Sequence, residues 1–291
     1  MDIDPIALDR LIDLALAEDV GTGDITTNSI VPPGQRSQAH FLAKSEGVIA
    51  GLDVAARVFT RLDPSARFEA RVRDGDLVAT GAVVATVDGA IRAVLSGERV
   101  ALNFLQRLSG IATAARQAVQ AATAANPKVL VVDTRKTVPG LRALDKYAVR
   151  CGGAGNHRFG LYDAALIKDN HIAVAGGIAA AVRAVKRTAS PFVKVEVEVQ
   201  TLDQVDEALA AGVDVIMLDN MAPDEMRRAV ARIGGRILVE ASGGITLERL
   251  GQVAATGVDL ISMGSLTHSV KAMDISLEVG ELSRAGKGGP K

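Results

Sequence analysis

Apolar and polar positions divide the chain into two parts with different patterns. In the first part, residues 4–19 carry apolar side chains at helical spacing, which predicts an amphipathic helix. Short runs typical of strands follow between residues 39 and 89, separated by glycines and Asp-Gly turn signals. A long helical pattern then extends from about residue 90 to residue 125. Residues 1 to about 110 are therefore expected to form a first domain that mixes strands and helices.

From residue 129 onwards, short apolar runs alternate with helical segments. The runs read VLVVD, AALIKD, FVKVEVEV, VDVIML, RILVEA and VDLISMG. Apolar, β-branched strands separated by helices predict a parallel sheet covered by helices. An open doubly wound sheet and a (β/α) barrel both satisfy this alternation.

The ends of these runs distinguish the two architectures. Each run stops at a polar sequence: DTRK, KDNH, the glutamates of KVEVEV, LDN, EASGG or SMGS. In a (β/α) barrel the carboxyl ends of the strands form one ring around the active site, whereas an open sheet uses only the crevice at its switch point. The polar ends favour the barrel, because all of them would then converge on one cavity.

Composition excludes several classes of protein. The 291 residues are 48% hydrophobic, which allows a sizeable core, but only 3% aromatic with no Trp, and the net charge is −1. A nucleic-acid partner is not expected, because its binders usually carry a basic face and exposed rings. Cys151 is the single cysteine, so an intrachain disulfide and a thiolate metal cage are excluded. The sequence shows neither a secretory signal pattern nor an apolar run of the roughly 20 residues that span a membrane, so we expect a cytoplasmic protein without a membrane partner.

Against this near-neutral background, positive charge gathers in one segment. The cations between positions 135 and 168 outnumber the acids by seven to two. The cations are Arg135, Lys136, Arg142, Lys146, Arg150, Arg158 and Lys168, and the acids are Asp145 and Asp163. Such a cluster predicts an anionic partner, with arginine as a fork for a carboxylate and lysine as a point charge for a phosphate.

Lys168 allows two interpretations. A lysine at the end of a barrel strand could act as a Schiff-base nucleophile, or it could clamp an anion. The neighbouring cations favour the clamp, with Asp169 as an ion-pair partner. Of the histidines in polar sequences, His157 adjoins the cations and His171 is the one most easily explained as orienting its loop.

Three acids fall within the barrel pattern. Glu196 and Glu198 share one face of a strand because side chains alternate, and Asp219 ends the next strand. Ribose hydroxyls, Mg²⁺ or the cationic cluster would be suitable partners, and internal ion pairing with Lys168 or Lys194 is the structural alternative. A functional role is favoured for Glu198 and Asp219, whereas Glu196 is undecided.

Two glycine-rich sequences follow the last two strands. They are Ser242-Gly243-Gly244 and Met263-Gly264-Ser265, and His268 stands just behind the second. Glycines let backbone N–H groups approach an anion, and the loops after the last strands of a barrel often hold a phosphate. The pair of loops therefore predicts a phosphate site.

Taken together, these motifs resemble those of the quinolinate phosphoribosyltransferases, the decarboxylating enzymes also called nicotinate-nucleotide pyrophosphorylases. The resemblance extends from EDVGTGDITT at Glu18 to GSLTHSVKAMDISLE, and the run from DTRKT to KDNH is its most specific part. It implies an α/β fold with an N-terminal α/β sandwich domain at residues 1–110, an incomplete (β/α) barrel domain at 111–284 and a flexible tail at 285–291.

The resemblance also implies an activity. Quinolinate and phosphoribosyl pyrophosphate would give nicotinate mononucleotide, pyrophosphate and CO₂, a step of NAD biosynthesis, with Mg²⁺ as cofactor. The enzyme would be a homodimer or higher homo-oligomer in which Arg99 reaches the neighbouring subunit's site. A paralogous phosphoribosyltransferase for another ring acid, such as nicotinate, is the alternative. A Schiff-base aldolase and a nucleotide-binding regulatory protein are more distant ones.

By the same resemblance, the site residues fall into groups. Arg135, His157, Arg158 and Lys168 would hold the quinolinate carboxylates, and Lys136 would contact the pyrophosphate side. Thr134 is a further expected substrate-binding residue. Glu198 and Asp219 would hold ribose hydroxyls or Mg²⁺, directly or indirectly. Ser242, Gly243, Gly244, Met263, Gly264, Ser265 and His268 would surround the 5′-phosphate. The catalytic group would comprise Lys136, Lys168, Glu198 and Asp219.

Overall fold

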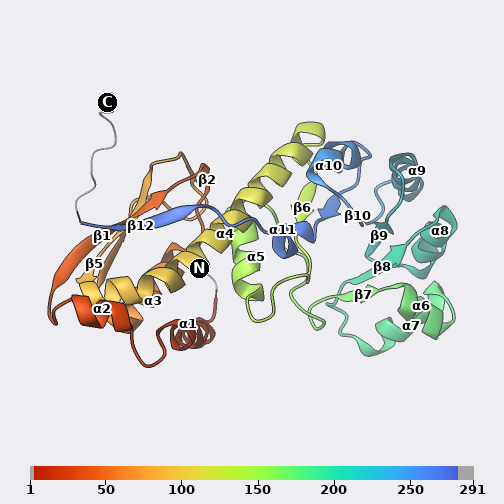
Figure 1. Ribbon diagram of the computed structural model, residues 1–291. Coiled ribbons are helices and arrows are strands. Elements are labelled where there is room, and N and C mark those ends of the chain that lie inside the picture. Colours follow the sequence, from red (N-terminus) through yellow and green to blue (C-terminus); the bar gives the residue numbers. More distant parts are fainter. Residues whose placement is uncertain (1–2, 281–291) are drawn as a thin grey trace. The chain divides into compact units, whose positions relative to one another are not determined.

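The computed structural model describes residues 3–280, which separate into two compact units (Figure 1). The first unit consists of residues 3–113 and 271–280, and the second of residues 114–270. The long helix α4 (Ile91–Ala125) carries the chain from the first unit into the second. The tail expected at 285–291 lies outside the described residues.

The first unit is built on a four-stranded antiparallel sheet in the order β12-β1-β5-β3. Its strands are β1 (Arg36–Ala43), β3 (Arg67–Ala70), β5 (Val83–Ala90) and β12 (Ile275–Val279), and β2 (Gly47–Val48) pairs with β4 (Leu77–Val78) in a small second sheet. Strand β12 pairs with β1 and buries Ile275 and Leu277. The chain therefore returns to the first unit, so residues 271–280 do not continue the second domain as expected from the sequence.

Helices α1 (Pro5–Val20), α2 (Ile25–Ile30) and α3 (Leu52–Leu62) belong to the first unit, together with the first part of α4. Helix α3 packs on the sheet, since the ring of Phe59 lies 5.9 Å from that of Phe41 and 6.4 Å from that of Phe68, centroid to centroid. The sequence pattern indicated only strand-like runs in this region and missed α3. Its helical spacing begins only after Gly51, directly behind an apolar run typical of a strand.

The second unit holds a six-stranded parallel sheet in the order β6-β11-β10-β9-β8-β7. Its strands are β6 (Leu130–Val132), β7 (Ala165–Ile167), β8 (Val195–Val199), β9 (Val215–Asp219), β10 (Leu238–Ser242) and β11 (Leu260–Ser262). Among the described residues, β6 and β7 are the two edges and do not pair with each other. The predicted fold class, an incomplete (β/α) barrel after an N-terminal α/β domain, is confirmed.

Helices follow the strands of the second unit. They are α5 (Arg142–Cys151), α6 (Asp169–Ala175), α7 (Ile178–Thr188), α8 (Leu202–Ala211), α9 (Pro223–Ile233), α10 (Leu247–Ala254) and the short α11 (Ser265–His268). The central strands bury apolar side chains such as Val197, Ile216 and Ile261 completely. Because all six strands are parallel, their carboxyl ends meet at one end of the sheet. Within the described part of the chain, no helix has the length and apolar character needed to span a membrane.

Candidate active site

A cavity of about 570 Å³ opens at the carboxyl ends of the parallel strands, a size typical of small-molecule sites. All of the predicted substrate-binding residues line it except Arg99. They are Thr134, Arg135, Lys136, His157, Arg158, Lys168, Glu198, Asp219, Ser242, Gly243, Gly244, Met263, Gly264, Ser265 and His268. Arg99 is exposed on α4 within the first unit. The polar ends of all six strands thus converge, as the barrel interpretation required.

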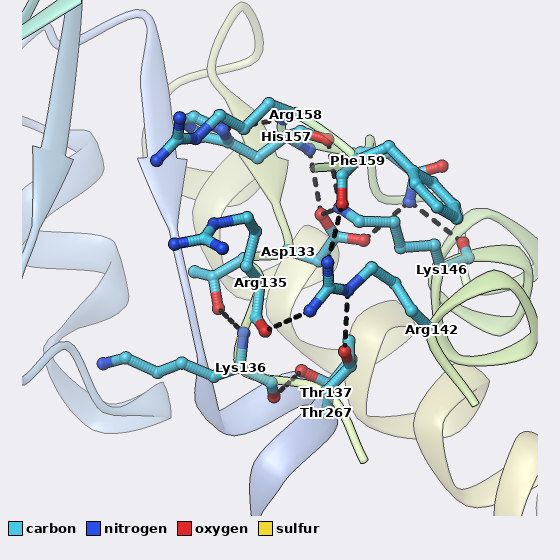
Figure 2. Close-up of polar contacts among 12 residues, drawn as sticks. Asp133, Arg135, Lys136, Thr137, Arg142, Lys146, His157, Arg158, Phe159 and Thr267 are labelled. Carbon is cyan, nitrogen blue, oxygen red and sulfur yellow. Dashed lines mark hydrogen bonds and ion pairs between the residues drawn. The ribbon is translucent and has the colours of Figure 1, made fainter. Parts of the chain in front are cut away.

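Only part of the cationic cluster faces this cavity. Arg135, Lys136, Arg158 and Lys168 line it, whereas the other three cations bond to protein groups. Arg142 donates to the carbonyls of Arg135 and Phe159 and to Thr137 Oγ1, at 3.3, 3.1 and 3.0 Å. Lys146 bonds Asp133 and Arg150 bonds Asn156. Figure 2 shows that the contacts of Arg142 and Lys146 join the loop after β6 to the loop that carries His157 and Arg158.

Lys168 and Glu198 form an ion pair across the ends of β7 and β8. Nζ of Lys168 lies 2.7 Å from Oε2 of Glu198, and the lysine side chain is 45% exposed. Lys168 therefore pairs with Glu198 and not with the expected Asp169, whose Oδ1 accepts the Asn170 amide. Because Nζ of Lys168 already contacts an anionic group, the geometry favours the clamp interpretation.

His157 lies between two buried carboxylates. Its Nε2 is 3.2 Å from Oε2 of Glu196 and 3.2 Å from Oε2 of Glu240. Its Nδ1 accepts the Arg158 amide hydrogen at 2.7 Å. Both ring nitrogens are thus engaged by the protein, and Glu196 is the acid that faces His157, whereas Glu198 lines the cavity. The undecided choice between the two glutamates is settled geometrically in this way.

The charge state of this triad follows from its surroundings. Burial would lower the pKa of His157, but the carboxylates of Glu196 and Glu240 raise it to about 10. An amide hydrogen directed at Nδ1 is accepted only by the neutral ring, so protonation of His157 would break the hydrogen bond from Arg158. Burial and the charge of Glu240 raise the pKa of Glu196. Glu240 Oε2 lies within ion-pair distance of His157 but outside hydrogen-bond geometry, so Glu240 acts on the ring through its charge.

The glycine loops border Lys136 and Asp219. Gly243 has φ +96°, and a Cβ there would collide with the side chain of Asn220. At Gly264, a Cβ would lie 2.8 Å from Cδ of Lys136. The Lys136 carbonyl also accepts from Thr267 Oγ1 at 2.8 Å, which ties the end of β6 to α11. The predicted phosphate loops and the predicted pyrophosphate cation are therefore neighbours.

Residues 111–278, which include the whole second unit, match a family model described as quinolinate phosphoribosyl transferase, C-terminal domain. The model of the N-terminal domain of the same family matches residues 24–109. The chain belongs to the quinolinate phosphoribosyl transferase family. The resemblance that the motifs indicated is thereby confirmed.

Individual relatives of this family cover almost the whole chain. The chain is 49% identical to a probable nicotinate-nucleotide pyrophosphorylase (carboxylating) of Bacillus subtilis, over 94% of each protein. It is 43% identical to a mitochondrial quinolinate phosphoribosyltransferase (decarboxylating) of Nicotiana tabacum, over 94% of the chain and 82% of the relative. The crystal structure of NadC from Streptococcus pyogenes is similar, with 42% identity, a TM-score of 0.93, and coverage of 97% of the chain and 100% of that structure.

In this quinolinate phosphoribosyl transferase family member, Glu240 and Asn220 line the cavity without having been predicted. Asn220 has φ +54°, the only positive φ outside glycine among residues 3–280, and its Nδ2 donates to Asp219 Oδ1 at 3.0 Å. The available signals were a charged residue inside the apolar run RILVEA and a polar residue next to a predicted acid at a strand end. His171, whose Nδ1 accepts the Lys168 amide at 2.9 Å, orients its loop as the structural interpretation held.

Proposed function

We propose that the chain transfers the phosphoribosyl group of phosphoribosyl pyrophosphate to the ring nitrogen of quinolinate, with loss of CO₂. The products are nicotinate mononucleotide and pyrophosphate, a step in the formation of NAD. The single observation that carries this proposal is the meeting of four cations and two glycine loops around one cavity. Both substrates are polyanions that repel each other in water, and a preorganised cationic site offsets that repulsion.

Arg135, Arg158 and Lys168 are assigned to the carboxylates of quinolinate. Burial lowers the pKa of Arg158, and the positive charge of Arg135 lowers it further. The two guanidiniums therefore repel each other, and a dicarboxylate bound between them would relieve this repulsion. His157 is assigned to the same part of the site, where its ring, when protonated between Glu196 and Glu240, would add a positive charge for the ring acid.

Lys136, Gly243 and Gly264 are assigned to the phosphates of the second substrate. Glycine at both loop positions keeps the backbone accessible, because a side chain at either would meet Asn220 or Lys136. Glu198 and Asp219, at the ends of adjacent strands, are assigned to the ribose hydroxyls or to Mg²⁺.

The donor set fits Mg²⁺. Carboxylate oxygens are the ligands that this ion prefers, and it usually takes one or two of them while retaining water and substrate phosphates. Lys168 bonds Oε2 of Glu198. Gln200 donates to Oδ2 of Asp219 at 3.2 Å, and Asn220 donates to Oδ1 of the same residue at 3.0 Å. Glu198 and Asp219 would hold the ion, and when bound it neutralises charge on the departing pyrophosphate.

The chemistry needs positioning and not a nucleophilic side chain. The electron pair of the quinolinate nitrogen forms a bond to the anomeric carbon while the bond to pyrophosphate breaks, and Lys136 stabilises the leaving group. The ring nitrogen is then cationic. When the adjacent carboxylate leaves as CO₂, the electron pair of the broken bond stays on the ring carbon, stabilised by that cation, and a proton from solvent completes nicotinate mononucleotide.

We further infer a homodimer in which Arg99 completes the site of the neighbouring subunit. Arg99 is exposed on α4 of the first unit and does not line the cavity of its own chain. An apolar hollow beside the edge strand β7, bordered by Leu161 and Val174, supplies surface for such a partner. Leu161 is 72% exposed and Val174 is 91% exposed in the single chain, and both border the same apolar hollow, as expected of a surface that a partner covers.

The function is tested by incubating the protein with quinolinate, phosphoribosyl pyrophosphate and Mg²⁺ and following nicotinate mononucleotide and CO₂ in equal amounts. Turnover of nicotinate, without CO₂ release from quinolinate, would instead identify the paralogous phosphoribosyltransferase. Binding of both ligands without product at any Mg²⁺ concentration would identify a regulatory protein.

The cytoplasmic location stays a prediction, since relatives from plants are described as mitochondrial or chloroplastic. Cell fractionation of the organism that makes this chain, with detection by antibody, tests it. Recovery of the protein in the soluble cytoplasmic fraction is the expected result.

A further inference from the structure

Two oppositely charged residues lie buried behind the cationic wall of the cavity, and neither lines it. Asp133 follows β6 and is fully buried, and Lys146 on α5 is 2% exposed. Nζ of Lys146 lies 2.5 Å from Oδ1 of Asp133. A buried ion pair of this kind is not required by the assigned substrate contacts, so its presence needs another explanation.

The pair holds His157 by its backbone. The His157 N–H donates to Oδ1 of Asp133 at 2.9 Å, and the His157 carbonyl accepts from Nζ of Lys146 at 3.0 Å. Asn156 adds a third donor to Asp133, through Nδ2 to Oδ2 at 2.8 Å. Figure 2 shows the pair between the loop after β6 and the loop that carries His157 and Arg158. Both backbone hydrogen-bonding groups of His157 therefore end on one ion pair.

The same pair is continuous with the other anion-binding segment. Asp133 directly precedes Thr134, Arg135 and Lys136 along the chain, and its amide donates to the Gly155 carbonyl at 3.3 Å. A shift of the carboxylate would consequently move both loops. The pair thus links the two backbone segments that carry Arg135 and Arg158.

Stability alone is a poor explanation for this arrangement. Removing two charges from water is costly, and well-packed apolar residues can replace a buried ion pair without loss of stability. Burial raises the pKa of Asp133 and lowers that of Lys146, which records this cost on both partners. Buried pairs are better attested as devices that select one conformation.

We propose that Asp133 and Lys146 are positioning residues, whose buried ion pair sets His157 and Arg158 at the spacing from Arg135 that a ring dicarboxylate requires. The proposal rests on the proposed function of the site. It assigns the pair to the recognition of quinolinate and not to that of the phosphoribosyl donor. The glycine loops for the donor follow β10 and β11, and Lys136 is held separately by the hydrogen bond from Thr267 Oγ1 to its carbonyl.

The test compares the wild type with Lys146→Met and with the double variant Asp133→Asn/Lys146→Met. Lys146→Met alone leaves the buried Asp133 carboxylate without its cation and could prevent folding. The double variant removes both charges, so it tests the proposal even if the single variant does not fold. In the folded double variant, we expect the KM for quinolinate to be about tenfold or more above that of the wild type, as the loss of a charge-assisted contact predicts. The KM for phosphoribosyl pyrophosphate should stay within about twofold of the wild-type value. Thermal unfolding and circular dichroism establish that the protein compared is folded.

Two further variants sharpen the comparison. Asn156→Ala removes one donor but keeps the ion pair, so we expect a smaller rise in the KM for quinolinate. Arg150→Met removes an exposed cation from the same helix, whose guanidinium bonds Asn156, and we expect both KM values to stay within about twofold because surface contacts contribute little.

Equal increases in both KM values, or an unchanged KM for quinolinate in the folded double variant, would overturn the proposal. If the double variant does not fold, an unchanged KM for quinolinate in Asn156→Ala would overturn it. Failure of the proposed function looks different, because the wild type itself would then form no nicotinate mononucleotide from quinolinate.

Discussion

Lys168 and Glu198 bridge the carboxyl ends of two adjacent parallel strands, with Nζ 2.7 Å from Oε2. Lys168 is assigned to quinolinate, and Glu198 is assigned to ribose or Mg²⁺. Substituting each residue in turn should therefore affect the binding of a different substrate. We expect Lys168→Met to raise the KM for quinolinate by about tenfold to a hundredfold, because a charge-assisted contact is lost. Glu198→Gln should act mainly on the KM for phosphoribosyl pyrophosphate. Steady-state kinetics with each substrate varied in turn measures both, and the reverse pattern would contradict the assignment.

Arg135 provides a second prediction. Arg135→Ala should lower kcat/KM for quinolinate by at least about tenfold, because a bidentate partner for a carboxylate is lost. Arg135→Lys should restore little of this, since an ammonium cannot form the two parallel bonds of a guanidinium. Kinetics like those of the wild type in either variant would count against a carboxylate at Arg135.

The His157 triad predicts how stability depends on pH. Because the folded-state pKa of about 10 lies above the ordinary value of 6.5, the folded protein holds the proton more tightly. The resulting stabilisation, on the order of a few kcal/mol, is fully present below pH 6.5 and is lost as pH rises through 10. His157→Asn should lack this decline, so the difference in free energy of unfolding between wild type and variant should shrink from pH 6 to pH 10. Denaturant unfolding at both pH values measures it, and a constant difference would refute the charge state assigned to the triad.

Two substitutions of Asn220 distinguish the contribution of its side-chain hydrogen bond from the cost of its positive φ. Asn220→Gly keeps the positive φ of 54° without strain but removes the hydrogen bond to Asp219, so we expect a reduced kcat/KM for phosphoribosyl pyrophosphate at nearly unchanged stability. Asn220→Ala also loses that bond and forces a side chain into the left-handed region, which costs about 1 kcal/mol of stability. Midpoints of denaturant unfolding check the order, and an alanine variant more stable than the glycine variant would contradict this account.

The proposed contribution of Arg99 to a neighbouring subunit is tested by complementation. Arg99→Ala and Lys168→Met homodimers should each be nearly inactive when quinolinate is held well below the raised KM of Lys168→Met. Mixing them by unfolding and refolding should restore about a quarter of the wild-type activity, because half of the subunits would pair as heterodimers, each with one intact site. Sedimentation should report dimers throughout. Mixed samples no more active than their components would place Arg99 in the site of its own chain or outside any site.

Much of the second unit could be predicted because parallel strands leave a strong pattern. The apolar runs end in polar residues, and parallel topology forces those ends together, so Lys136 and Gly264 could be assigned to one site despite their distance along the chain. The order of the strands and the open edges at β6 and β7 could not be predicted, because they depend on contacts between segments far apart in the sequence.

The division of labour among the cations could not be predicted. Lys146 and Lys168 have the same chemistry in the sequence, but one lies inside on α5 beside Asp133 and the other lies at a strand end. Which face of a short helix is buried depends on the elements packed around it, and in α5 the buried face includes both Asp145 and Lys146. Helix α3 was missed for another reason, since its helical spacing starts directly behind a strand-like run that ends at Gly51.

The pairing of β12 with β1 has a consequence for how the molecule is made. During translation, the ribosome synthesises the whole second unit before it synthesises β12, which pairs with the edge of β1. The earlier unit can therefore reach its final sheet only after the later one has been synthesised. A chain cut after Val270 would present the bare edge of β1, a row of unpaired amides and carbonyls that invites association with other strands.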